Sequence, residues 1–223
     1  MFVNLNSDLA SRPRFFGEFG MLSQTEISLS EFKYNRGAEL FGEAEPAEYV
    51  YQVIDGSVRS YKLLSDGRRQ INAFHLVGDI FGLENGDTHR FTAEAIVDTI
   101  VRLVKSVSLS HIAKNDVIVA RDLLNMTAKN LQRAEDHMLL LGRKTSLERV
   151  AAFLLEMDHR LTAAGVMALP MCRRDIADYL GLTLETVSRA LSALHDQGIL
   201  GFLGQTQRQI VLLDRPRLAE LDL

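Results

Sequence analysis

The sequence predicts an α+β chain in three parts: an N-terminal β-roll of the double-stranded β-helix or jelly-roll kind, a long helix, and a C-terminal winged helix-turn-helix. Three patterns predict it. Glycines recur between β-rich runs, an apolar heptad follows, and two short amphipathic helices then meet at a glycine before two more β-rich runs. We expect the three parts at residues 1–115, 116–142 and 143–223.

The predicted roll is punctuated by Gly56, Gly67 and Gly78, each eleven residues after the last. Asp55-Gly56 and Asp66-Gly67 are typical of hairpin turns, because such pairs tolerate the positive φ that tight turns require. The β-rich runs are residues 49–53, 58–63, 71–76 and 93–104. Short strands at this spacing indicate an all-β roll or barrel.

A seam of apolar and small residues marks the long helix. Its members recur at alternating steps of three and four: Val117, Ala120, Leu124, Thr127, Leu131, Ala134, Met138 and Leu141. A heptad of more than three repeats, with charges such as Lys129 and Arg133 off the seam, favours pairing with a second helix and hence a homodimer. An ordinary amphipathic helix packed on its own domain is the alternative.

A boundary is expected where this helix ends. Gly142 should break it, and Thr145 with Glu148 forms a capping-box signature that begins another helix running to about Leu161.

Two short helices then follow, separated by a glycine. In the first, Ile176, Ala177 and Leu180 form one apolar face, and Gly181 supplies the left-handed residue that ends a helix. Thr183 is the expected N-cap of the second helix. Its buried side should carry Val187, Ala190, Leu191 and Leu194. Two helices joined in this way make a helix-turn-helix.

The opposite face of the second helix is polar, with Glu185, Ser188, Arg189 and Ser192 in one narrow sector. Arg189 can donate two hydrogen bonds to guanine, Glu185 can accept one from cytosine, and Ser188 can approach thymine. We therefore expect base contacts from Leu184, Glu185, Ser188 and Arg189. A solvated face with a Glu185–Arg189 ion pair is the alternative.

Residues 199–203 and 209–213 are strand-like and flank a polar segment that is typical of a wing. Phosphate contacts position a protein on DNA without reading its sequence. We expect such contacts from Arg173, Arg174, Thr183, Gln207 and Arg208.

Composition excludes several other classes of protein. The net charge is −4, with 10 basic and 10 acidic residues in 143–223 and 15 against 19 in 1–142, so the prediction of DNA binding depends on pattern and not on charge. Cys172 is the only cysteine, which excludes a disulfide framework and, by itself, a zinc or iron–sulfur site. No run is long enough to cross a bilayer and no signal peptide is evident, so we expect a cytoplasmic protein without membrane contact.

Cys172 lies just before the first helix of the motif, beside Arg173 and Arg174. A helix N-terminus and nearby cations stabilise a thiolate, which oxidises selectively. This position should also face a DNA phosphate, so oxidation would oppose binding. We expect a redox-sensitive cysteine; a small apolar residue or weak cap is the alternative.

The segment Glu185-Thr186-Val187-Ser188-Arg189 resembles the E-x-x-S-R recognition motif of the FNR and FixK branch of the CRP/FNR superfamily. The cyclic-AMP receptor branch has glycine where Ser188 stands and arginine where Leu184 stands. Residues 169–183 are especially similar to FixK proteins, and the resemblance covers nearly the whole chain. It implies a transcription activator that binds double-stranded DNA as a homodimer at an inverted repeat of TTGAT-like half-sites.

The same resemblance implies a sensor-like role for the roll and a contact with RNA polymerase. The expected polymerase surface is the loop Leu161 to Leu169, with Thr162 and Val166; a plain connector is the alternative. Cyclic-nucleotide binders of the superfamily carry Gly-Glu and Arg-Ser pairs, but here Leu83 separates Gly82 from Glu84, and residues 89–90 are His-Arg. We therefore expect no cyclic nucleotide, no iron–sulfur cluster and no other cofactor.

Two rival functions are a regulator controlled by a cyclic nucleotide or other small ligand, and an enzyme of the cupin type. The six histidines lack paired His-x-His spacing, and each is expected to be a surface or packing residue. They are His75, His89, His111, His137, His159 and His195. No nucleophile elbow or phosphate-binding glycine loop occurs, so we expect no enzyme.

Overall fold

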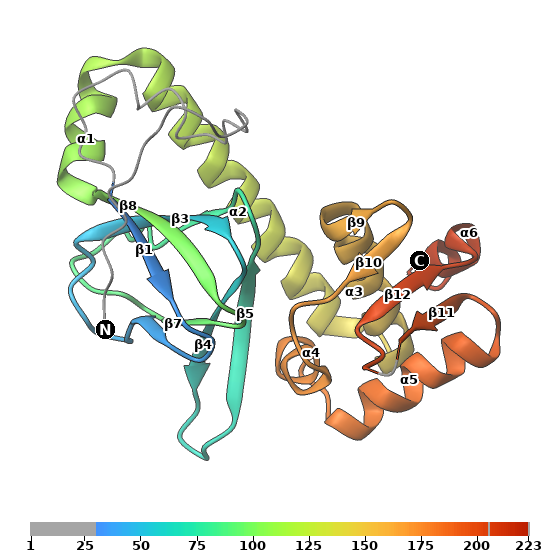
Figure 1. Cartoon of the computed structure of the whole chain (residues 1–223). Helices are drawn as coiled ribbons and strands as arrows, with labels where there is room; N and C mark the ends of the chain where they lie inside the picture. Colours follow the sequence, from blue (N-terminus) through green and yellow to red (C-terminus); the bar gives the residue numbers. More distant parts are fainter. Residues whose placement is uncertain (1–29, 205, 223) are drawn as a thin grey trace. The chain divides into compact units, whose positions relative to one another are not determined.

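The computed structural model describes residues 30–204 and 206–222 (Figure 1). It confirms the predicted fold class, because strands, a long helix and a winged helix-turn-helix follow one another in that order. The chain divides into two compact units, one of residues 30–63 and 72–132 and the other of residues 64–71 and 133–222. Each has its own core.

The β-roll consists of two four-stranded sheets, with strand orders β1-β8-β3-β6 and β2-β7-β4-β5. The strands are β1 Ser30–Tyr34, β2 Glu39–Phe41, β3 Tyr49–Asp55, β4 Val58–Leu63, β5 Arg69–His75, β6 Ile80–Phe81, β7 Thr92–Ala95 and β8 Thr99–Lys105. The predicted run 93–104 is thus two strands in different sheets. Both faces of β3 are covered, since Tyr51 packs inside the roll and Val50 packs in a second cluster with Leu109 of the helix that follows.

The two predicted hairpin turns have different outcomes. Asp66-Gly67 joins β4 to β5, which are neighbours in one sheet, so that prediction is confirmed. Asp55-Gly56 joins β3 to β4, which lie in different sheets, so it is not a hairpin. Gly56 is still required there, because its φ is +85° and an added Cβ would lie 2.5 Å from the carbonyl oxygen of Asp98. The dipeptide fixes a sharp turn but not the pairing of the strands beside it.

Two helices follow the roll, α1 Ser106–Asn115 and α2 Val117–Arg143. Val119 and Met126 bury one face of α2 against Val50 and Val104. The predicted break at Gly142 is one residue early, because α2 runs through it and ends at Arg143. Glycine lowers helix propensity without forcing an end.

The second unit begins with α3 Ser146–Leu161, capped as predicted, since Thr145 N donates to Glu148 Oε2 at 2.8 Å and Glu148 N to Thr145 Oγ1 at 3.4 Å. The remaining elements are β9 Thr162–Ala163, β10 Val166–Ala168, α4 Arg173–Leu180, α5 Leu184–Asp196, β11 Leu200–Leu203, β12 Gln209–Leu212 and α6 Arg215–Glu220. Their strands form one sheet in the order β11-β12-β10-β9.

The segment expected as a loop at 161–169 is a hairpin. Ala164 and Gly165, both at positive φ, turn β9 back onto β10, and β10 pairs with β12 of the wing. Strand β9 has two residues and β10 has three, so neither is long enough to be identified by alternating apolar and polar residues. Among the helices of the described ranges, none has the length and apolar character needed to cross a membrane.

Candidate DNA interface

The helix-turn-helix is confirmed residue by residue. Gly181 ends α4 in the left-handed conformation, at φ 63°, and its N–H bonds the carbonyl of Ala177. The next amide, Leu182 N, donates to the same carbonyl at 3.0 Å. Thr183 then caps α5, accepting a hydrogen bond from Thr186 N at 3.2 Å. The turn therefore fixes the direction in which α5 leaves α4.

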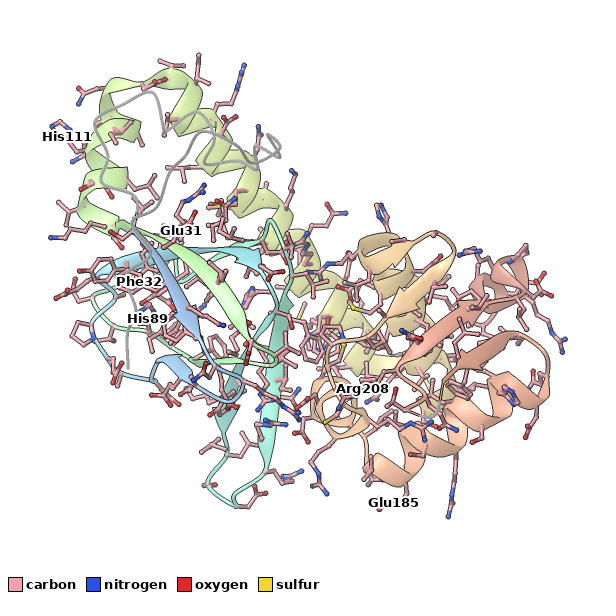
Figure 2. The ribbon with its side chains drawn as sticks, viewed as in Figure 1. Glu31, Phe32, His89, His111, Glu185 and Arg208 are labelled. Atoms are coloured by element: carbon pink, nitrogen blue, oxygen red, sulfur yellow. The ribbon has the colours of Figure 1, made fainter. Side chains whose placement is uncertain are left out.

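The two faces of α5 separate as predicted. Its buried residues are Val187, Ala190, Leu191 and Leu194. Glu185, Arg189 and Ser192 are exposed, whereas Leu184 and Ser188 are half-buried. Figure 2 shows Glu185 near the N-terminal end of α5, directed away from the domain. Within the described residues, no ion pair joins Glu185 to Arg189, so both side chains remain available to a ligand.

The residues expected at phosphates are not equally available. Arg174 is exposed, and Arg208 is half-buried on the wing (Figure 2). Thr183 already uses its hydroxyl as the cap of α5. Arg173 donates to the side-chain oxygen of Gln207, so the structure pairs two residues for which separate phosphate contacts were expected. The pair connects α4 to the wing.

Phe202 of β11 supports this connection and was not identified from the sequence. The Arg173 guanidinium lies 5.8 Å from its ring centroid, and the His195 ring stacks on it at 5.4 Å. A cation over an aromatic face is attracted by the ring's electrons. An isolated phenylalanine in a strand gives no sequence signal for such a role.

Cys172 is the N-cap of α4, and its neighbour differs from the expected one. Its backbone N and its Sγ each lie 3.1 Å from Oδ2 of Asp175, so the thiol donates to a carboxylate. Asp175 is buried, and its other oxygen accepts from Arg69 Nη2 at 2.6 Å. Arg173 and Arg174 were the charges expected beside the sulfur. The structure adds the Asp175 carboxylate, which is in direct contact with the thiol.

The residues compared above with the Gly-Glu and Arg-Ser pairs of cyclic-nucleotide binders pack against other side chains of the β-roll. His89 is buried and stacks on Phe41, with ring centroids 3.6 Å apart. Glu84 accepts from the backbone N and the Nε of Arg90, both at 3.3 Å. Gly82 packs so closely on Tyr51 that an added Cβ would lie 2.8 Å from its ring. In the described part of the chain, no group of three or more His, Cys, Asp or Glu side chains could hold a metal ion.

One face of α2 exposes large apolar side chains at a regular interval. The exposed fractions are 83% for Val117, 68% for Leu124, 58% for Leu131 and 66% for Met138. These four residues are spaced by seven and belong to the predicted seam. Of the other seam residues, Thr127 and Ala134 are exposed, and Ala120 and Leu141 are half-buried.

The fold and the exposed face of α5 define a winged helix-turn-helix protein, and the comparisons agree. Residues 148–221 match the Crp-like helix-turn-helix domain, and residues 31–116 match the cyclic nucleotide-binding domain. The chain is 45% identical over 195 residues to the nitrogen fixation regulation protein FixK of Azorhizobium caulinodans, covering 85% of this chain and 77% of that one. It is 38% identical over 191 residues to the transcriptional activatory protein AadR of Rhodopseudomonas palustris, covering 82% and 80%.

Among solved structures, FixK2 from Bradyrhizobium japonicum superposes with a TM-score of 0.85 at 69% identity, covering 88% of this chain and 98% of that one. The chain belongs to the CRP/FNR superfamily of transcription regulators and to its FixK-like branch. The relatives named above are regulatory proteins, and the match of residues 148–221 is to a helix-turn-helix domain.

Proposed function

We propose that this regulator binds DNA as a homodimer, at an inverted repeat of TTGAT-like half-sites, and without a cyclic nucleotide or an iron–sulfur cluster. The observation that carries the proposal is the exposed polar face of α5, with Arg189 and Glu185 unpaired within the described residues. Two reading helices related by a two-fold axis match a site with the same symmetry. The half-site is inferred from the superfamily.

The apolar stripe of α2 supports the homodimer. A helix in water rarely exposes four large apolar residues at one seven-residue interval, whereas a paired helix buries them. Sedimentation equilibrium, together with fluorescence anisotropy on a labelled duplex, tests both parts. We expect two chains for each inverted repeat, and one chain for each would contradict the homodimer.

Binding without a cyclic nucleotide is supported by the side chains at the positions of the Gly-Glu and Arg-Ser pairs. A nucleotide phosphate needs hydrogen-bond donors, but here the Glu84 carboxylate pairs with Arg90, and His89 is stacked on Phe41. The match to the cyclic nucleotide-binding domain favours a second candidate, a ligand-controlled regulator. Calorimetry with cyclic AMP and cyclic GMP separates the two, because heat of binding together with tighter DNA binding would favour the second.

An activator must also contact RNA polymerase, and we place this contact on the β9–β10 hairpin. The name of AadR supports activation. Val166 is half-buried, and Ala163 to Gly165 are exposed at the tip. Substitutions at Thr162 or Val166 should abolish transcription in vitro and leave DNA affinity intact. Unchanged transcription would remove the hairpin from this role.

A further inference from the structure

Three helix ends meet at one side chain in the second unit. Arg149, in the first turn of α3, donates from Nε to the Lys144 carbonyl at 2.9 Å, from Nη1 to Leu180 at 2.9 Å and from Nη2 to Leu141 at 3.0 Å. Leu141 lies in the last turn of α2, Lys144 follows that turn, and Leu180 is the last residue of α4. The final carbonyls of a helix have no partner within it, and a cation there also complements the helix dipole.

A second side chain binds the neighbouring carbonyl of α4. His137 Nε2 lies 2.9 Å from the Tyr179 carbonyl, and since a carbonyl only accepts, this nitrogen carries the proton. The imidazole also stacks on the Tyr179 ring, with centroids 4.0 Å apart and planes 10° from parallel. Two consecutive carbonyls, just before the turn at Gly181, are therefore bound from α2 and from α3.

Packing and hydrogen bonds both contribute to this joint, since the stacked His137 and Tyr179 rings lie beside the bonds to the α4 carbonyls. A cleft of about 650 Å³ opens beside it, lined from α2 by Leu139 and Leu140, from α3 by Leu155 and Glu156, and from α4 by Tyr179. On that side the joint is open, so the hydrogen bonds from Arg149 and His137 to the α4 carbonyls are the polar contacts that hold the end of α4 against α2 and α3. Such bonds are directional and weaken steeply when the angle changes.

We propose that Arg149 and His137 are positioning residues that fix α5 relative to α2 and thereby set the separation and rotation of the two half-sites. The proposal rests on the homodimer proposed above. The end of α4 determines the start of α5 through the Gly181 turn, and paired α2 helices would be common to both subunits. Neither residue belongs to the reading face of α5, so both act through the backbone of α4.

Duplexes with altered spacing between half-sites test this proposal. One inserted base pair rotates a half-site by about 34° around the DNA axis, so the wild type should prefer one spacing by about tenfold or more. Arg149→Lys keeps the charge but loses the fork of donors. We expect it to reduce that preference to about twofold, while binding to a duplex with a single half-site stays at the wild-type value.

The matched control is Arg215→Lys, which removes another two-nitrogen contact to α3, from Arg215 to Asp158 at 2.7 and 2.9 Å. It should keep the wild-type spacing preference. His137→Phe retains the ring stacking and loses one bond, so it gives a smaller relaxation and serves as the test if Arg149→Lys does not fold.

Two results would overturn the proposal: a spacing preference unchanged in both folded variants, or an equal loss of affinity on every duplex, including the single half-site. A wild type that binds an inverted repeat no better than one half-site would instead overturn the homodimer, and this proposal with it.

Discussion

The helices α2 and α5 each bury one face and expose the other, but the two exposed faces differ in chemistry. That of α2 carries large apolar side chains such as Leu124 and Leu131. That of α5 carries Glu185, Arg189 and Ser192. An apolar stripe gains free energy when another apolar surface covers it, whereas forked donors and acceptors gain specificity from base edges. The chemistry of an exposed helix face thus indicates which partner the helix binds.

The largest effect is expected from charged substitutions in the apolar face of α2. Leu124→Glu with Leu131→Glu places four carboxylates in the proposed dimer seam, which should dissociate the homodimer. Losing the second half-site contact should weaken specific binding by about 10²–10⁴-fold. Analytical ultracentrifugation and anisotropy measure the two effects. Asn125→Glu, exposed on another side of α2, is the control, and a doubly substituted chain that stays dimeric would exclude the stripe as the interface.

The next effect concerns the polar face. Arg189→Ala should cost about 1–3 kcal/mol on the specific site and little on random DNA, because base contacts specify while phosphate contacts position. Arg174→Ala should instead weaken both DNAs alike and lower the salt slope by about one. Titrations of both duplexes at several salt concentrations distinguish the two. An equal loss of affinity for both DNAs in Arg189→Ala would show that Arg189 does not contact bases.

A smaller effect is expected at Cys172. Oxidation to a sulfinate would replace the thiol donor by an anion 3.1 Å from the Asp175 carboxylate, as well as opposing a phosphate. Peroxide should therefore weaken DNA binding several-fold in the wild type. Cys172→Ser keeps a hydroxyl donor and should remain active and resistant, whereas Cys172→Asp should mimic the oxidised form. Peroxide sensitivity that persists in Cys172→Ser would refute the role, since the chain has no other cysteine.

The smallest expected effect is on the stability of the β-roll, and it tests whether His89 acts there as a buried packing residue. Burial lowers the pKa of His89, although Glu84 opposes the shift. The unfolded chain then binds a proton more readily, so the free energy of unfolding is highest above the ordinary pKa of 6.5 and falls as the pH drops below it. His89→Phe should flatten that dependence, measured by urea unfolding between pH 5 and pH 8. His111→Gln, at an exposed site, is the control and should keep the wild-type pH dependence of the free energy of unfolding. An unchanged pH dependence in His89→Phe, or a flattened one in His111→Gln, would show that His89 is not its source.

Features that depend on nearby residues were predictable from the sequence. The α4–turn–α5 motif follows from Gly181, Thr183 and the apolar period, all of which act within one or two helical turns. The seam of α2 follows from its heptad. The bond from Arg149 to the Leu180 carbonyl spans 31 positions, and the bond from Arg173 to Gln207 spans 34. Both depend on residues that folding brings together, and no local pattern encodes them.

Some local features were also missed. Cys172 is three residues from Asp175, but the prediction considered only the helix N-terminus, the neighbouring cations and a DNA phosphate, and left this carboxylate out. A capping box with cysteine as the cap departs from the usual Ser, Thr, Asp or Asn. Asp55-Gly56 correctly predicted a turn but wrongly predicted that β3 and β4 pair as a hairpin, because strand pairing is decided by the tertiary fold.

The pairing of β10 with β12 gives the second unit a mechanical property. One hydrogen-bonded sheet continues from the wing strands β11 and β12 to the β9–β10 hairpin. Two residue pairs join β10 to β12 and two join β9 to β10, so the wing strands cannot shift relative to the hairpin without breaking those backbone hydrogen bonds. If the proposed phosphate contacts displaced the wing, we therefore expect the β9–β10 hairpin to move with it. RNA polymerase bound at Ala164 and Gly165, as proposed above, would then be coupled to the DNA contact of the wing through one sheet.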